Sequence, residues 1–363
     1  MRKLIFVICM LCFFSSLTLA NSGYFEPCGK HPFSFFYFHE TNKLYSGCLT
    51  YEGSRKLIVS DPLTLNTNKE YTVNSFVECV EPVNNGYSLL ILLSDVDCNG
   101  GTEDGVLRQI AYSDGHTEHE YSFSTIPLGL VVDSQENYAY VSSGLAHTEV
   151  DPIITKINLS TWQRVGEDVK YGRFSNYLAL THDDSKLYVK TCDVVRHDHV
   201  TNIMYFGIGV FDTSDMSKIN EIEINVMPSV IKMGYDNRLY VGGEPLTPEE
   251  PSLFVINTTN DTVTPLIYAN AGFIDIALDN INHKLYASTT ILQWDSEYKI
   301  HIPEPSNMVY QIDLENQYSY QVFTPAEENI VLIEAVPIDD PNYSCRLFAT
   351  ASEGKKVYYM DIP

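Results

Sequence analysis

Short apolar runs separated by clusters of turn-forming residues make up most of the chain after residue 20. The runs are rich in Val, Ile, Tyr and Phe, and Asp, Asn, Gly and Ser mark the turns between them. Such runs are typical of β-strands, and no stretch keeps the 3.6-residue period of an amphipathic helix. The pattern therefore predicts an all-β protein in which helices are scarce.

One phrase, a polar turn followed by a strand similar to "KLYV", recurs along the chain and reveals an internal repeat. Its seven copies are "ETNKLYSG" ending at Gly47, "NNGYSLLILLS" ending at Ser94, "SQENYAYVSS" ending at Ser143, "DDSKLYVKT" ending at Thr191, "YDNRLYVGG" ending at Gly243, "NINHKLYAS" ending at Ser288 and "NYSCRLFAT" ending at Thr350. Each copy follows one apolar run and precedes two more, so a unit holds four short strands. Seven units in residues 21–363 give roughly 49 residues each, a period typical of repeat folds.

Four antiparallel strands repeated seven times predict a seven-bladed β-propeller, with residues 21–363 as a single domain. One four-stranded sheet cannot bury both faces alone, whereas a closed ring of sheets covers them and protects the edges. The last unit is one strand short, and "SGYFEPCG" at residues 22–29 can complete it and so lock the ring. A six-bladed ring and a pair of β-sandwiches are the alternatives.

The stretches "RLYVGG" and "SLFVINTTNDTV" in the fifth unit resemble the YVTN or surface-layer type of propeller repeat. The resemblance covers most of residues 21–363, and lactonase-like and NHL-type propellers share the pattern. The resemblance therefore implies a fold and leaves the chemistry open.

Residues 1–20 have the three parts of a secretory signal peptide. Arg2 and Lys3 form a basic start, residues 4–14 form an apolar core, and Thr18-Leu19-Ala20 is a small-residue cleavage site. The apolar core is shorter than the roughly 20 residues of a membrane span, and no later segment is continuously apolar for that length. We expect a secreted chain that begins near Asn21, with a membrane-anchored N-terminus as the alternative.

The formal charge of −24 narrows the choice of partners. Nucleic acids and anionic membrane surfaces attract clustered Lys and Arg, so we expect neither as a partner. A hydrophobic content of 44% is ample for a large core and excludes a disordered chain. The acidity itself is typical of a well-solvated surface and also attracts cations.

Cysteines and glycosylation sequons agree with secretion. Six cysteines remain after the signal peptide, an even number that suggests disulfides without selecting a pairing: Cys28, Cys48, Cys79, Cys98, Cys192 and Cys345. Four asparagines lie in Asn-X-Ser/Thr sequons: Asn158, Asn257, Asn260 and Asn342. In a bacterial protein these sequons would carry no meaning.

The repeat places the sequons and the longest loops on opposite faces of the ring. We name the strands of a blade A to D from the channel outward, so that A–B and C–D connections share one face and B–C connections lie on the other. All four sequons fall in A–B or C–D connections. The B–C loops are longer and look irregular, and we expect binding residues there, although long loops are also simply tolerated insertions.

The B–C loop of the second blade has the ligand spacing of a calcium site. Asp95, Asp97, Asn99 and Glu103 place oxygens at positions one, three, five and nine around Gly100. The loop is not an EF-hand, because position twelve is Val106, but it resembles the shorter calcium loop of integrin-α-type propellers. That resemblance implies a Ca²⁺ cofactor; the alternative is an acidic turn.

Other B–C loops carry histidines and aromatic residues. His197 and His199 are two positions apart, so in an extended strand both imidazoles can bind one transition metal. The alternative is that both are simply exposed loop residues. Trp294, Tyr298 and His301 can form a stacking platform for a sugar or peptide, or can pack their own loop. His147 is a further candidate in the third blade.

No linear catalytic motif accompanies these loops: we find no nucleophile elbow, phosphate loop, dinucleotide fingerprint or HExxH. We therefore expect a binding or scaffold protein with an extracellular protein or glycan partner, rather than an enzyme. The alternatives are a metal-dependent hydrolase, lactonase or lyase acting at the channel mouth, and a structural component of a surface coat or matrix. An enzyme needs converging acidic or His side chains in the channel, whereas a plain scaffold allows a bland lining.

Overall fold

The computed structural model describes the chain from residue 22 to residue 363, with short gaps. The described ranges are 22–27, 31–50, 52–95, 104–144, 152–171, 177–198, 201–234, 236–245, 249–268, 271–295, 300–316, 319–323, 330–351 and 356–363. Within them the regular structure is β-strand, and no helix there is long and apolar enough to cross a membrane.

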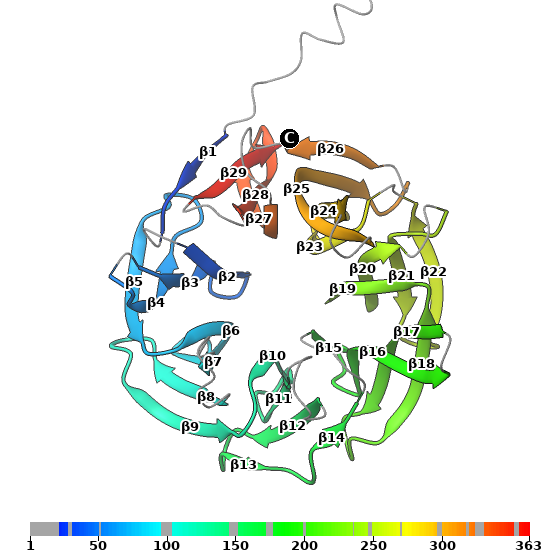
Figure 1. Ribbon diagram of the computed structural model, residues 1–363. Coiled ribbons are helices and arrows are strands. Elements are labelled where there is room, and N and C mark those ends of the chain that lie inside the picture. The colour runs from blue at the N-terminus through cyan, green and yellow to red at the C-terminus, as the bar shows by residue number, and fades with distance from the viewer. Residues whose placement is uncertain are drawn as a thin grey trace, which may run out of the picture.

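Seven antiparallel sheets form a ring around a central channel (Figure 1). Blade 1 contains β2 (His31–Phe38), β3 (Lys43–Leu49), β4 (Arg55–Ser60) and β5 (Thr67–Val73). Blade 2 contains β6 (Phe76–Val83), β7 (Ser88–Asp95), β8 (Asp104–Ala111) and β9 (Thr117–Phe123). Blade 3 contains β10 (Pro127–Val132), β11 (Tyr138–Ser143), β12 (Ile153–Asn158) and an outer strand in two pieces, β13 (Gln163–Arg164) and β14 (Val169–Lys170).

The remaining four blades follow in chain order around the ring. Blade 4 contains β15 (Leu178–Leu180), β16 (Lys186–Asp198), β17 (Thr201–Asp212) and β18 (Lys218–Ile224). Blade 5 contains β19 (Val226–Met233), β20 (Arg238–Pro245), β21 (Leu253–Asn257) and β22 (Thr262–Ile267). Blade 6 contains β23 (Phe273–Asp279), β24 (Lys284–Asp295), β25 (Ile300–Asp313) and β26 (Ser319–Phe323). Blade 7 contains β27 (Ile330–Asp340), β28 (Tyr343–Ala351), β29 (Val357–Ile362) and, from the other end of the chain, β1 (Ser22–Phe25).

The first strand completes the last blade, as the sequence predicts. β1 pairs antiparallel with β29, from Ser22 opposite Met360 to Phe25 opposite Val357. The Phe25 ring contacts Phe348 edge-on, with the ring centroids 6.2 Å apart. The ring is thus closed by strands from both ends of the chain, and the seven-bladed fold is confirmed in preference to the six-bladed alternative.

The junction between blades 7 and 1 also holds a buried ion pair. Arg346 donates to both carboxylate oxygens of Asp361, at 2.6 and 3.0 Å. The same guanidinium donates to the backbone carbonyls of Pro62 and Leu63, at 3.2 and 2.9 Å, in the β4–β5 turn of blade 1. Arg346 therefore joins the last blade to the first through side-chain as well as strand contacts.

The recurring phrase encodes the packing between blades. Its aromatic position lies on strand B, and the side chain there is almost completely buried in five blades: Tyr45, Tyr140, Tyr188, Tyr240 and Tyr286. Leu90 and Phe348 occupy the equivalent place in blades 2 and 7 and are also fully buried. Since truncating a buried aromatic residue typically costs about 3–5 kcal/mol, this position stabilises every blade interface.

Candidate functional site

The Asp95 loop lies where the repeat places it, between strands B and C of blade 2. Asp95 is the last residue of β7 and pairs with Asp104, the first residue of β8. Asp97, Asn99 and Glu103 lie outside the described residues. The position of the loop is therefore established, and calcium binding remains a prediction.

Two of the B–C connections are β-ribbons, not the irregular loops that we expected. In blade 4 the pairing of β16 with β17 continues to Asp198 opposite Thr201. In blade 6 the pairing of β24 with β25 continues to Asp295 opposite Ile300. The irregular-loop prediction is wrong here because residues of high strand propensity, among them Val194, Thr201 and Ile300, allow the ladders to continue past the blade.

Three of the candidate binding residues predicted from the sequence lie on the two ribbons. His197 lies opposite Asn202 in the blade 4 ribbon, and Trp294 lies opposite His301 in the blade 6 ribbon. His199, Tyr298 and His147 lie outside the described residues. The structure therefore pairs Trp294 with His301 in register and keeps His197 in a different blade from both.

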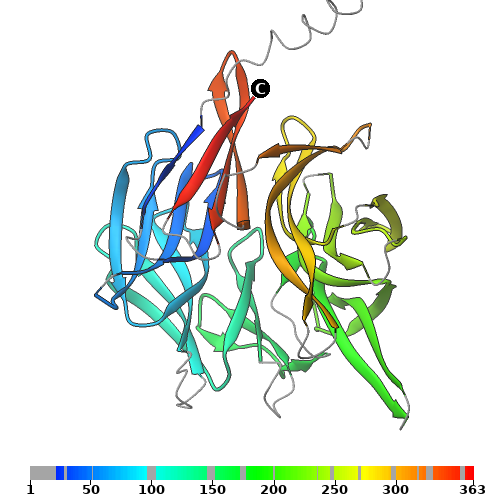
Figure 2. The ribbon, with the colours of Figure 1, turned by 45° about the horizontal axis from the view of Figure 1, so that its top comes forward.

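Within the described residues, the outer parts of both ribbons pair only with themselves. β15 pairs with β16 only up to Val189, and β18 pairs with β17 only from Phe206 onward. Likewise, β23 reaches only Thr289 of β24, and β26 pairs with β25 only from Val309 onward. Figure 2 shows the green β16–β17 ribbon projecting beyond the rest of the ring.

The sequon asparagines share the opposite face, as the register predicts. Asn158 ends β12 and Asn257 ends β21, so these two and Asn260 lie at C–D turns, while Asn342 lies in the β27–β28 turn. The amide oxygens of Asn158, Asn257 and Asn260 accept hydrogen bonds from nearby backbone N–H groups, at 2.9–3.2 Å.

A cavity of about 660 Å³ occupies the central channel. All seven A strands or the residues next to them contribute to its lining. Most of the residues that line it are apolar, among them Phe36, Leu130, Leu180, Met233 and Leu332. The ionisable residues of the lining are Glu78, Glu81, Lys232, Asp275 and Glu334. The channel is thus an apolar tube with a few charged groups, the composition typical of small-molecule sites.

Three charged residues from blades 5, 6 and 7 meet on one side of the channel. Lys232 Nζ lies 3.2 Å from Glu334 Oε1. Asp275 is buried, and its two oxygens accept the backbone N–H groups of Ile276 and Ile333, each at 2.9 Å. Because Ile333 belongs to the next blade, Asp275 also ties blade 6 to blade 7.

Burial perturbs the ionisation of this group. It raises the pKa of Glu334 to about 7, even though Lys232 favours the carboxylate. It also raises the pKa of Asp275, against the opposing effects of Lys232 and the two N–H donors. Burial alone would lower the pKa of Lys232, but Glu334 and Asp275 raise it above its ordinary value. The ammonium is thus already matched by two carboxyl groups.

A second set of acidic groups lines the channel from blade 2. The Ser94 hydroxyl donates to Glu78, whose pKa is raised by burial. Burial, together with repulsion from Glu40 and Glu136, raises the pKa of Glu81 to about 8. Cys79, between them in sequence, is a free thiol whose pKa burial raises to about 12.

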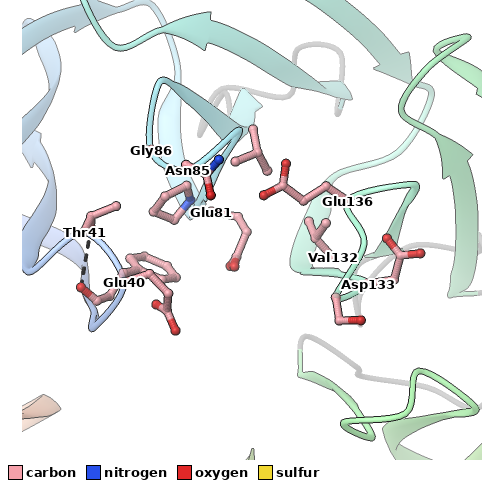
Figure 3. A pocket seen from close by; sticks show the side chains of 12 residues that line it. Glu40, Thr41, Glu81, Asn85, Gly86, Val132, Asp133 and Glu136 are labelled. Atoms are coloured by element: carbon pink, nitrogen blue, oxygen red, sulfur yellow. Dashed lines mark hydrogen bonds between the residues drawn. The ribbon is translucent and has the colours of Figure 1, made fainter.

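Glu81 also lines a separate pocket of about 330 Å³ at the channel mouth on the sequon face. The pocket is formed by the A–B hairpins of blades 1, 2 and 3, and its acidic residues are Glu40, Glu81, Asp133 and Glu136. No Lys, Arg or His is among the residues that line it. Figure 3 shows Glu81 between Glu40 and Glu136, with the three side chains directed into the space between the hairpins.

Sequence reasoning missed the channel because each charged residue stands between apolar neighbours within an inner strand. The inner strands read "FVECVEPV", "VMPSVIKM", "FIDIALD" and "IVLIEAVPIDD". A charged residue with apolar neighbours on the innermost strand of a propeller is the signal that could have identified these residues. Among the described residues no three His, Cys, Asp or Glu side chains are grouped so as to hold a metal ion.

The channel lacks the bland lining expected of a plain scaffold, because charged groups converge on it from four blades.

The prediction that the six cysteines form disulfides needs correction. Cys79 and Cys345 are free thiols, so the even cysteine count does not mean that all six are paired. Both lie in strands, where they pack as small apolar residues.

Comparison with known proteins supports the fold alone. No protein-family model and no curated protein matches the chain, so the likeness to YVTN repeats stays a resemblance. Among solved structures, the chain is similar to the β-propeller domain of Myceliophteria thermophila Cps50 (Swd1), with a TM-score of 0.66 and 11% identity over 95% of this chain and 100% of that one. It is also similar to Kuenenia stuttgartiensis hydrazine synthase, with a TM-score of 0.55 and 13% identity over 84% of this chain and 100% of that one.

Proposed function

We propose that this propeller is a secreted binding protein that engages an extracellular protein through its B–C face. The observation that carries the proposal is the pair of ribbons, β16–β17 and β24–β25, which extend past the blades. A rigid ring that holds two paired strands clear of its own surface presents them to a partner at little cost in conformational entropy.

The ribbon composition favours a protein partner. Trp, Tyr and Arg are the residues most enriched at binding hot spots, and the ribbons and their tips contain Arg196, Trp294 and Tyr298. The outer edges of both ribbons also leave backbone groups available for strand addition. Four potential glycans on the opposite face would leave the B–C face as the accessible one.

Secretion and glycosylation are part of the same proposal. They are supported by the signal-peptide pattern of residues 1–20 and by the shared face of the four sequons. Glycopeptide mapping of the protein recovered from culture medium tests both. An N-terminus at Met1, or a protein retained inside the cell, would contradict secretion.

The experiment on the ribbons compares binding to intact cells of the source organism. Fluorescently labelled mature protein should bind the cells, and protease treatment of the cells should abolish binding. Trp294→Ala should weaken binding tenfold or more. Tyr87→Ala removes an equally large aromatic side chain, 78% exposed at the β6–β7 turn of the other face, and should have no effect.

Shortened ribbons provide the second test. Replacing residues 194–204 by Asn-Gly keeps the Asp193–Tyr205 pair next to a two-residue turn, and should abolish binding without lowering the melting temperature. Binding that survives this change and Trp294→Ala would overturn the proposal. Binding that is lost after glycosidase treatment but survives protease would assign a glycan partner instead.

The alternative of a metal-dependent hydrolase, lactonase or lyase rests on one observation, the carboxyl groups of raised pKa in the channel. That observation meets part of the requirement for an enzyme, namely converging acidic groups in a concave site. The described residues supply no grouped metal ligands to go with it. We therefore interpret the channel first as a binding site.

A further inference from the structure

We propose that the central channel binds an elongated organic dication, a flexible alkyl chain with an ammonium group at each end. The site consists of the mouth pocket of blades 1–3 and the channel cavity that it adjoins, with Glu81 lining both. This inference is independent of the ribbons, because the ribbons lie on the opposite face.

Charge complementarity selects a cation. The mouth pocket has four carboxyl groups and no basic side chain in its lining. The channel adds Glu78, Asp275 and Glu334, against Lys232 as the basic residue of its lining. Since Lys232 is matched by Glu334 and Asp275, it is a poor receptor for an anionic ligand. A cationic ligand, by contrast, relieves repulsion at both positions.

Glu81 is the residue best placed to receive the first ammonium. Among the described contacts its carboxyl group has no hydrogen-bond partner, whereas Glu136 accepts the backbone N–H of Asn84 at 2.7 Å, and Asp133 accepts the N–H groups of Asn137 and Tyr138 at 2.6 and 2.9 Å. A half-buried carboxyl group without a partner is costly, and a hydrogen-bonded ammonium removes that cost.

The walls and dimensions select an alkyl chain with a second charge. Leu130, Val131 and Val132 lie on the same strand between the mouth and the channel interior and offer apolar surface to methylene groups. Glu78 lies three residues before Glu81 on β6, farther into the channel, and can receive the second ammonium. The volumes of about 330 and 660 Å³ fall within the range of about 300–1,000 Å³ found for small-molecule sites.

An organic dication fits this arrangement better than a metal ion. A divalent metal needs several oxygens within about 2.0–2.6 Å of one point, and the described residues contain no such group of side chains. The carboxyl groups are instead spread along an apolar tube. They can therefore serve two separated charges joined by hydrocarbon.

Isothermal titration calorimetry of the mature protein with 1,5-diaminopentane at pH 8.5, above the pKa of Glu81 and below that of an alkylammonium group, tests the proposal directly. The matched probes are 1-aminopentane, with one ammonium, 1,5-pentanediol, with none, and calcium chloride. We expect the diamine to bind at least tenfold more tightly than the monoamine, and the diol not to bind. Weaker diamine binding in 300 mM than in 50 mM sodium chloride should accompany this order.

Variants locate the two ends of the ligand. Glu81→Gln should weaken the binding of both the diamine and the monoamine by tenfold or more. Glu78→Gln keeps a partner for the Ser94 hydroxyl. It should weaken the binding of the diamine alone, and lower its affinity to about that of the monoamine. Glu52→Gln removes the same charge from an exposed turn between β3 and β4 and should change neither affinity.

Three results would overturn the proposal: no diamine binding at millimolar concentration, equal binding of diol and diamine, or unchanged binding by Glu81→Gln. Binding of calcium in preference to the diamine would assign the mouth to a metal ion. Because the ribbon-shortened variant retains the channel, it should bind the diamine normally, which separates this test from that of the proposed function.

Discussion

The folding stability of this protein should depend on pH through Glu81. Burial and the neighbouring Glu40 and Glu136 raise the pKa of its carboxyl group to about 8, from an ordinary value of 4.5. Between these two pH values the folded chain holds a proton that the unfolded chain has released. The resulting stabilisation is complete below pH 4.5 and is lost as the pH rises through 8.

The size of the effect follows from the pKa difference. One pKa unit corresponds to about 1.36 kcal/mol, so raising the pH from 6 to 9 should remove about 3 kcal/mol. Glu81 is only half-buried, so solvent screening reduces the effect, and we therefore expect a measured loss of about 1–3 kcal/mol. Glu81→Gln removes the ionisable group and keeps its shape. Raising the pH from 6 to 9 should therefore lower the free energy of unfolding of the variant by about 1–3 kcal/mol less than that of the wild type.

Urea unfolding at pH 6, 7, 8 and 9, followed by tryptophan fluorescence, measures this difference. The stability difference between Glu81→Gln and the wild type should be smallest at pH 6, grow up to pH 8 and level off above it, with the variant the more stable at pH 9. Glu52→Gln should follow the wild type at every pH. Parallel pH dependence of Glu81→Gln and the wild type would refute the reasoning, since it would mean that Glu81 ionises normally in the folded protein.

Further predictions concern ring closure and the free thiols. Arg346→Ala removes the Arg346 guanidinium from the buried Asp361 carboxylate and should lower the free energy of unfolding by about 3–5 kcal/mol; a loss below 1 kcal/mol in urea titration would contradict a structural role for this pair. Deletion of residues 22–27 uncovers the edge of β29 and should produce dimers or larger species in size-exclusion chromatography, while a stable monomer would show that β1 is dispensable. Cys79, with a pKa of about 12 against an ordinary 9.0, should react with iodoacetamide at pH 8 roughly 10³-fold more slowly in the folded than in the unfolded protein, and fast native labelling would contradict its burial.

The sequence by itself determined the architecture, because the information is local and repeated. Each "KLYV" phrase specifies a turn, a strand and one buried aromatic residue such as Tyr188, and the same phrase returns about every 49 residues. The missing strand of the last unit and the spare strand at residues 22–25 together predict how the ring closes. The face that carries the sequons follows from the same register.

The tertiary structure alone decided the candidate sites. Lys232 and Glu334 are 102 positions apart and look like isolated charges in apolar strands, and only ring closure brings them to 3.2 Å. Burial raises the pKa of Glu81, and repulsion from Glu40 and Glu136, which belong to the hairpins of two other blades, raises it further. The ribbons likewise depend on strand pairing that continues beyond the blade. The turn-forming residues near their tips instead favoured irregular loops when only the sequence was considered. Local pattern encodes strands and their order, whereas a charge acquires its chemistry from the burial and the neighbours that the closed ring provides.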